Sequence, residues 1–146
     1  MNHTLALTAF LTVTLDLGIK LLPHAPDRVL LPGLLAWTFT QNIGAAFGMF
    51  SANPALTLAV SAGLTLALGW FLSKKHFTRF ESMALGLMLG GAAGNIIDRA
   101  VHGAVTDYLE FLFFRFPVFN LADAALTSGA ALLIIYWFVL KKGSLK

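Results

Sequence analysis

The chain has 146 residues, of which 58% are hydrophobic and only 12% are charged, with a formal net charge of +3. Soluble domains carry about 25% charged residues, so this composition excludes a water-soluble fold and indicates a membrane protein. The sequence contains no cysteine, which excludes disulfides, thiol catalysis, cysteine-ligated metals and lipidation of the chain itself.

Four segments are expected to be transmembrane helices, because a span needs about 20 mostly apolar residues. They lie roughly at residues 4–22, 55–73, 81–98 and 122–140. The first has no basic start, has no small-residue cleavage site and contains Asp16 and Lys20, so we expect an uncleaved helix rather than a signal peptide. The sequence predicts an all-α integral membrane protein, a single four-helix domain over residues 1–146.

Two long connections separate these segments. Residues 31–50 are apolar but contain Pro32, Gly33, Gly44 and Gly48, which favours a helix lying on the membrane surface or short strands over a fifth span. Residues 105–119 are rich in aromatic side chains. We therefore expect an outward-facing interfacial helix or a small β-like cradle built from the connections.

Three glycines in the third segment share one helical face. Gly86, Gly90 and Gly94 are spaced by four residues. Small residues at this spacing let helix backbones approach closely in lipid. We interpret them as a packing face without a chemical role.

The basic residues predict the orientation. Six lie in the connection after the second segment and in the C-terminal tail, whereas three lie in the two long connections. The positive-inside rule then places both termini in the cytoplasm and the long connections outside. The net positive charge reflects these membrane anchors, so we expect no nucleic-acid partner.

Several polar residues lie at the outward ends of the predicted helices, where ionisable groups indicate function. Asp16 and Lys20 are four residues apart, which favours a salt bridge that holds the first helix in register over a direct role in chemistry. Asp98 is interpreted as part of a helix-end network. Asn95 and Arg99 fit that network and a substrate clamp equally well.

Asp107 and Asp123 are the best candidates for catalysis. Asn120 and Asp123 open the fourth helix like an N-cap and a capping box, but this does not explain Asp107 in the preceding connection. Two carboxylates held together cannot both stay ionised, so the pair would supply one general base and one general acid. Such a dyad hydrolyses peptides without a metal or cofactor.

The chain resembles the prolipoprotein signal peptidases, or signal peptidase II, over nearly its whole length. Five elements match the family in order. They are Asp16 with Lys20, Asn42-Ile43-Gly44-Ala45-Ala46-Phe47, Gly94-Asn95-Ile96-Ile97-Asp98-Arg99, Val105-Thr106-Asp107, and Phe119-Asn120-Leu121-Ala122-Asp123.

The resemblance implies four transmembrane helices and an aspartic endopeptidase of the bacterial inner membrane, with its active site facing outward. It would remove signal peptides by cutting before a diacylglyceryl-modified cysteine. Its partners would be lipid-modified prolipoproteins and membrane lipids, and we expect a monomer without metal or cofactor. The implied roles are a catalytic dyad of Asp107 and Asp123, substrate-positioning or bracing residues Asn42, Asn95, Arg99 and Asn120, and orienting residues Asp16 and Lys20.

The chain departs from the family at one motif. It has Val105-Thr106-Asp107-Tyr108 where Val-Val-Asp-Phe is usual. We expect Thr106 and Tyr108 to add hydrogen bonds near the dyad without loss of activity.

Two other functions are alternatives to peptide hydrolysis. A small proton- or ion-coupled transporter should have acids near the bilayer midplane and inverted repeats, whereas the acids here lie at one end of the spans. A structural subunit of a membrane complex would use its polar residues only for packing. Both rank below the peptidase.

Overall fold

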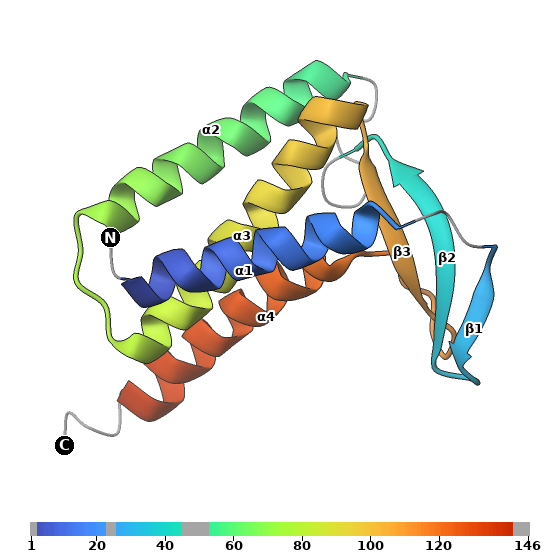
Figure 1. Ribbon diagram of the computed structural model, residues 1–146. Coiled ribbons are helices and arrows are strands. Elements are labelled where there is room, and N and C mark those ends of the chain that lie inside the picture. The colour runs from blue at the N-terminus through green and yellow to red at the C-terminus, as the bar shows by residue number, and fades with distance from the viewer. Residues whose placement is uncertain (1–2, 23–25, 45–52, 142–146) are drawn as a thin grey trace.

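The structure is a computed structural model that describes residues 3–22, 26–44 and 53–141. Helices run side by side, and three strands lie across one end of them (Figure 1). In chain order the elements are α1 (His3–Lys20), β1 (Arg28–Leu31), β2 (Leu35–Asn42), α2 (Pro54–Ser73), α3 (Arg79–His102), β3 (Val105–Phe111), α4 (Leu121–Ile135) and the π-helical continuation η2 (Tyr136–Lys141).

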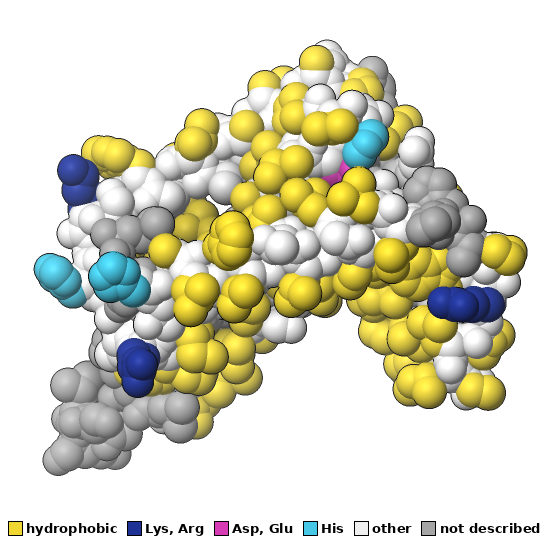
Figure 2. Space-filling model, in the orientation of Figure 1, with side chains coloured by type: hydrophobic (Ala, Val, Ile, Leu, Met, Phe, Trp, Pro, Cys, Tyr) yellow, Lys and Arg dark blue, Asp and Glu magenta, His cyan; other side chains and the backbone are white. Residues whose placement is uncertain are grey.

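Three helices in the described part are long and apolar enough to cross a membrane. They are Pro54–Ser73, Arg79–His102 and Leu121–Val139, which correspond to the second, third and fourth predicted segments. The first predicted segment, α1, has 18 residues but is not among these three, because Asp16 and Lys20 lower its hydropathy. Exposed leucines and aromatics cover the helix flanks (Figure 2), which is the surface that a lipid environment favours.

The central helix is α3, and its glycines bring α1 against it. A Cβ atom added to Gly86 would lie 2.8 Å from the Leu5 carbonyl oxygen, and one on Gly90 would lie 2.7 Å from that of Ala9. Gly94 faces α1 in the same way, beside the Asp16 carboxylate. The predicted packing role of this glycine face is confirmed.

A second small-residue contact joins α3 to α4. Gly91 faces the backbone of Ala122, and Gly129 faces the backbone of Ala84. The spacing of four predicted only the first glycine face. This second contact was not predicted from the sequence. Together the two contacts place the outer ends of α1, α3 and α4 close enough for their polar side chains to meet.

The expected cradle is an antiparallel sheet in the order β1-β2-β3, so the fold is mostly helical rather than all-α. Of the two structures considered for residues 31–50, the described part forms strands, while residues 45–50 lie outside it. A register shift between Trp37 and Thr40 interrupts the pairing of β2 with β3, after which Thr40 pairs with Asp107.

The two ends of the bundle differ in what they bury. Leu5, Leu72, Leu85 and Leu133 form an apolar core toward the end where α1 begins and α4 finishes, away from the sheet (Figure 1). Glu81 and Ser82 are also buried near that end, but a larger group of buried polar residues gathers at the sheet end, among them Asp16, Asn95, Asp98, Asp107 and Asn120. Since unpaired buried polar groups are costly, this second cluster must be held by its own hydrogen bonds.

Candidate active site

Two carboxylates meet where the sheet covers the helices. Asp107 lies on β3, and Asp123 lies in the first turn of α4. The side chain of Asp107 is buried, with 1% of its surface exposed. Asp123 lies near enough for its charge to act on Asp107, so the aromatic-rich connection does fold back toward the start of α4.

Asparagine amides connect the two carboxylates. Asp107 accepts hydrogen bonds from Asn42 Nδ2 at 3.1 Å and from Asn120 Nδ2 at 2.7 Å. Asp123 accepts one from Asn95 Nδ2 at 2.7 Å. Because Asn120 Nδ2 also lies 3.1 Å from Asn95 Oδ1, a chain of two amides runs from one carboxylate to the other.

Asn120 has a second task as the N-cap of α4. Its Oδ1 accepts the backbone N–H of Asp123 at 2.8 Å, so the predicted cap is confirmed. The first turn of α4 is also tied to β3, because the Tyr108 hydroxyl oxygen accepts the N–H of Leu121 at 3.0 Å. The hydrogen bond expected from Tyr108 is therefore present, and it fixes the strand of one aspartate to the helix of the other.

A buried cation supports the cluster from α1. Lys20 Nζ lies 2.8 Å from Asp16 and 3.3 Å from Asp98, and it donates to Asn95 Oδ1 at 3.0 Å. The predicted Asp16–Lys20 salt bridge is present, but the link from Lys20 to Asn95 was not predicted. It orients the Asn95 amide, because an oxygen that accepts from Lys20 leaves Nδ2 to donate to Asp123.

Two further contacts hold the backbone around the site. Asp16 Oδ1 accepts the N–H of Ala122 in α4 at 3.0 Å, and Asp98 Oδ2 accepts the N–H of Thr106 in β3 at 2.6 Å. Asp98 also lies 2.7 Å from Nδ1 of His102, a partner one helical turn away that the sequence spacing could have revealed. The helix-end interpretation of Asp98 understated its contact with the strand.

Arg99 approaches the site from α3. Its Nη2 donates to the carbonyl oxygen of Gly44 at 2.6 Å, a contact that no sequence pattern indicated. Its Nε is buried and has no hydrogen-bond partner within the described residues. Arg99 therefore holds the backbone just after β2 ends.

Burial is the main influence on the acidity of Asp107. Removal from water, followed by the charge of Asp123, raises the pKa of Asp107 to about 7, although the Asn42 and Asn120 amides oppose this rise. Burial likewise raises the pKa of Tyr108, so its hydroxyl stays neutral. A carboxyl that is protonated near neutral pH beside a second carboxylate can work as general acid and general base.

Two cavities open onto this cluster. One of about 360 Å³ is lined by Asn42, Asn95, Arg99 and Asp123 together with the apolar residues Phe119 and Leu126. The other, of about 380 Å³, lies among α2, α3 and α4 and shares Asn95 and Arg99 with the first. No group of three or more His, Asp and Glu side chains suited to a metal occurs in the described ranges.

Comparison with known proteins gives several lipoprotein signal peptidases as relatives. The lipoprotein signal peptidase of Gloeobacter violaceus is 39% identical over 138 residues, covering 88% of this chain and 78% of its own. That of Acaryochloris marina is 40% identical over 139 residues, covering 92% and 82%. That of Halothermothrix orenii is 35% identical over 135 residues, covering 89% and 92%.

Two solved structures of bacterial membrane enzymes have the same fold. A bacterial membrane enzyme determined by the in meso method at 2.3 Å resolution superposes with a TM-score of 0.84 at 32% identity, covering 98% of this chain and 91% of its own. A second, at 1.9 Å, gives a TM-score of 0.80 at 30% identity and covers 93% of each chain. The family described as signal peptidase (SPase) II matches residues 8–139, and the chain therefore belongs to the signal peptidase II family.

Proposed function

We propose that this chain is the aspartic endopeptidase that removes signal peptides from prolipoproteins, with Asp107 and Asp123 as its catalytic dyad. It would cut immediately before the diacylglyceryl-modified cysteine. The observation that carries the assignment of the dyad is the amide chain through Asn120 and Asn95, which ends on one carboxylate at each side. The family membership gives no support to the transporter alternative.

The raised pKa of Asp107 indicates how the dyad divides its work. In this proposal the dyad shares one proton, which is held by Asp107, the carboxyl with the raised pKa, while Asp123 acts as the base. Asp123 takes a proton from a water molecule, whose oxygen attacks the scissile carbonyl carbon, while Asp107 protonates the carbonyl oxygen. Asp123 then returns its proton to the leaving amine nitrogen, and the second proton of the diol returns to Asp107 as the C–N bond breaks. One water is consumed, and the dyad recovers its single proton.

The supporting residues have separable roles in this proposal. Asn42 and Asn120 hold the Asp107 carboxyl group, and Asn95 holds that of Asp123. Asp16 and Lys20 fix the orientation of Asn95 and the start of α4. The Nε of Arg99, which has no hydrogen-bond partner within the described residues, would donate to the peptide carbonyl next to the scissile bond.

The two cavities give the substrate a path. The one among α2, α3 and α4 is bordered by Leu64, Leu68, Met88 and Leu126 and ends at Asn95 and Arg99. Apolar walls leading to a few convergent polar groups are typical of a site that binds an apolar ligand and orients its reactive part. A signal peptide entering sideways from lipid would place its apolar segment here and its cleavage site beside the dyad.

We further propose that α1 is the fourth transmembrane helix, with both termini in the cytoplasm of a bacterium and the dyad facing outward across the inner membrane. The basic residues Lys74, Lys75 and Arg79 follow α2 at the end of the bundle opposite the sheet, which supports this orientation. The protein would work as a monomer that contacts membrane lipids and takes lipid-modified prolipoproteins as substrates.

The test uses purified protein in lipid vesicles with a diacylglyceryl-modified prolipoprotein and its unlipidated form, and a gel shift reports cleavage. Only the lipidated form should be cut, and Asp107→Asn and Asp123→Asn should each abolish cleavage. Asp27→Asn is the matched control, because Asp27 is exposed and accepts a hydrogen bond from the Phe39 N–H of β2 rather than from the amides that hold the dyad. Retained cleavage in either dyad variant would refute the assignment of the dyad.

A further inference from the structure

Five phenylalanine rings pack together where β3 leads into the loop before α4. We call Phe111, Phe113, Phe114, Phe116 and Phe119 the phenylalanine cluster. Its ring centroids are 4.7 Å apart for Phe113 and Phe114 and 4.8 Å apart for Phe111 and Phe119. Despite this packing, Phe113 remains 59% exposed and Phe114 46% exposed, and the cluster borders a surface hollow of about 520 Å³.

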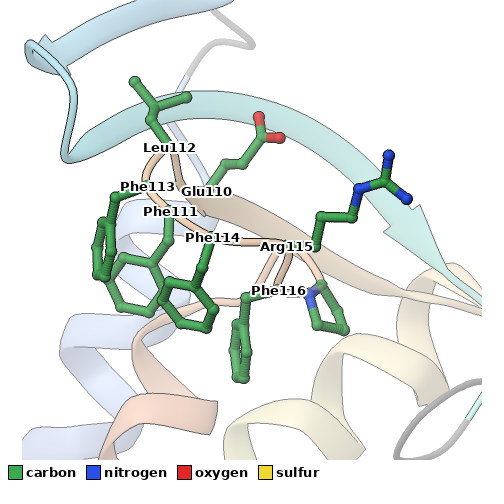
Figure 3. Close-up of a pocket in the computed structure, with 8 residues that line it drawn as sticks. Glu110, Phe111, Leu112, Phe113, Phe114, Arg115 and Phe116 are labelled. Carbon is green, nitrogen blue, oxygen red and sulfur yellow. The ribbon is translucent and has the colours of Figure 1, made fainter.

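The polar neighbours of these rings point elsewhere. Phe111, Phe113, Phe114 and Phe116 all extend to the same side of the loop, whereas Glu110 extends to the opposite side (Figure 3). Thr38 donates to the Glu110 carboxylate at 2.7 Å, which holds that side chain on the sheet. One side of this loop is therefore aromatic, whereas Glu110 and Leu112 extend away from the rings on the other side (Figure 3).

The position of the cluster in the fold indicates what covers it. The sheet extends beyond the ends of the helices and overhangs their flank (Figure 1). In the space-filling view its overhanging lobe is hydrophobic on the side that faces the helices, and a notch separates the two (Figure 2). Exposed hydrophobic side chains therefore lie on both sides of this notch, on the helix flank and on the sheet (Figure 2).

We propose that the phenylalanine cluster inserts into the outer interfacial layer of the bilayer beside the helices. Aromatic rings favour this depth, and an exposed aromatic patch of this kind facing water would be unusual. The edge of the sheet continues the contact, because Val29, Leu31 and Leu34 are all about half exposed or more. Arg28, between this edge and the connection from α1, is suited to reach lipid phosphates.

The proposed membrane contact also sets the position of Asp107 relative to the bilayer. Phe111 is the last residue of β3, and Asp107 lies on the same strand. A strand is stiff over so few residues, so anchoring the rings in lipid sets the depth of Asp107 relative to the membrane surface. The phenylalanine cluster thereby determines how far from the bilayer the cleavable bond must lie.

The experiment measures the depth of single side chains and needs no substrate, so it is independent of the proposed peptidase activity. Since the chain has no cysteine, Phe114→Cys and Phe113→Cys each give one attachment point for an environment-sensitive fluorophore. Glu110→Cys is the matched control on the opposite side of the same segment. The labelled proteins are placed in vesicles of phosphatidylethanolamine and phosphatidylglycerol that carry nitroxide groups at the headgroup, shallow acyl or deep acyl position.

Labels at Phe113 and Phe114 should emit at shorter wavelength than the label at Glu110 and should be quenched most by the shallow acyl nitroxide. The label at Glu110 should instead be quenched by aqueous iodide. Equal iodide quenching at all three positions would overturn the proposal. So would labels at Phe113 and Phe114 that become shielded only after a lipidated prolipoprotein is added, because the cluster would then bind substrate rather than lipid.

Discussion

The Asn120 side chain makes two hydrogen bonds that a substitution can separate. Its oxygen caps α4 by accepting the N–H of Asp123, while its nitrogen donates to Asp107 at 2.7 Å. In Asn120→Ser the shorter hydroxyl can still cap the helix, since serine and asparagine are comparable N-caps, but it is too short to keep the hydrogen bond to Asp107. The variant should therefore fold normally and lose one contact to the dyad.

The magnitude follows from the hydrogen bond to Asp107. A hydrogen bond to a charged group contributes about 1.5–3 kcal/mol, and a shift of one pKa unit corresponds to about 1.4 kcal/mol. The Asn120 amide stabilises the ionised carboxylate, so its loss disfavours ionisation and raises the pKa of Asp107 from about 7 by roughly one to two units. Cleavage needs one proton on the dyad. The pH at which the rate falls should therefore be higher for the variant than for the wild type.

Single-turnover cleavage in vesicles, measured across neutral and alkaline pH, reports this change directly. The wild-type rate should decline as the pH rises through the pKa of Asp107, and the alkaline limb should move upward by roughly one to two pH units in Asn120→Ser. Asn53→Ser is the matched control, because Asn53 caps α2 by accepting from Leu56 N–H far from the dyad. An unchanged alkaline limb in an Asn120→Ser protein that still cleaves would refute the role given to this hydrogen bond.

Three further substitutions test the support of the site. Lys20→Met leaves two buried carboxylates without their cation and should lower the free energy of unfolding by about 3–5 kcal/mol, measured by thermal unfolding in detergent. Gly91→Ala places a methyl group against the Ala122 carbonyl and should cost about 1–3 kcal/mol, whereas Gly63→Ala in open space should not destabilise the protein. Tyr108→Phe removes the hydrogen bond from Leu121 N–H and should cost about 1 kcal/mol while cleavage continues; complete loss of cleavage would contradict a purely structural role for this hydroxyl.

Local patterns were sufficient to predict the helices and several of their contacts. The spacing of four predicted the packing face of Gly86, Gly90 and Gly94, and the Asn120 cap was predicted from residue type alone. These features depend on neighbours in the same helix or on helical periodicity. The strands were only one of two structures expected for their segment, since β2 is interrupted by a register shift after Trp37 and lacks a regular alternation.

The contacts that organise the site could not be predicted in the same way. Lys20 donates to Asn95, 75 positions further along the chain, and Arg99 reaches back to Gly44 across 55 positions. Such pairings are decided by how closely the helices pack, and no periodicity within one segment records them. The resemblance to a family therefore indicated which residues matter, while the structure was needed to connect them.

The order in which the chain leaves the ribosome has a consequence for this site. Asp16 in the first helix accepts the N–H of Ala122 in the last, 106 positions away. Until the final helix has been synthesised and inserted, Asp123 is absent and Asp16 lacks this partner. With Asp107 and Asp123 as the proposed dyad, a nascent or truncated chain should be inactive, and cleavage should begin only when the first and last helices pack together. Separately expressed fragments, one ending after α3 and one containing α4, should each be inactive and should regain cleavage when they are made together in the same membrane.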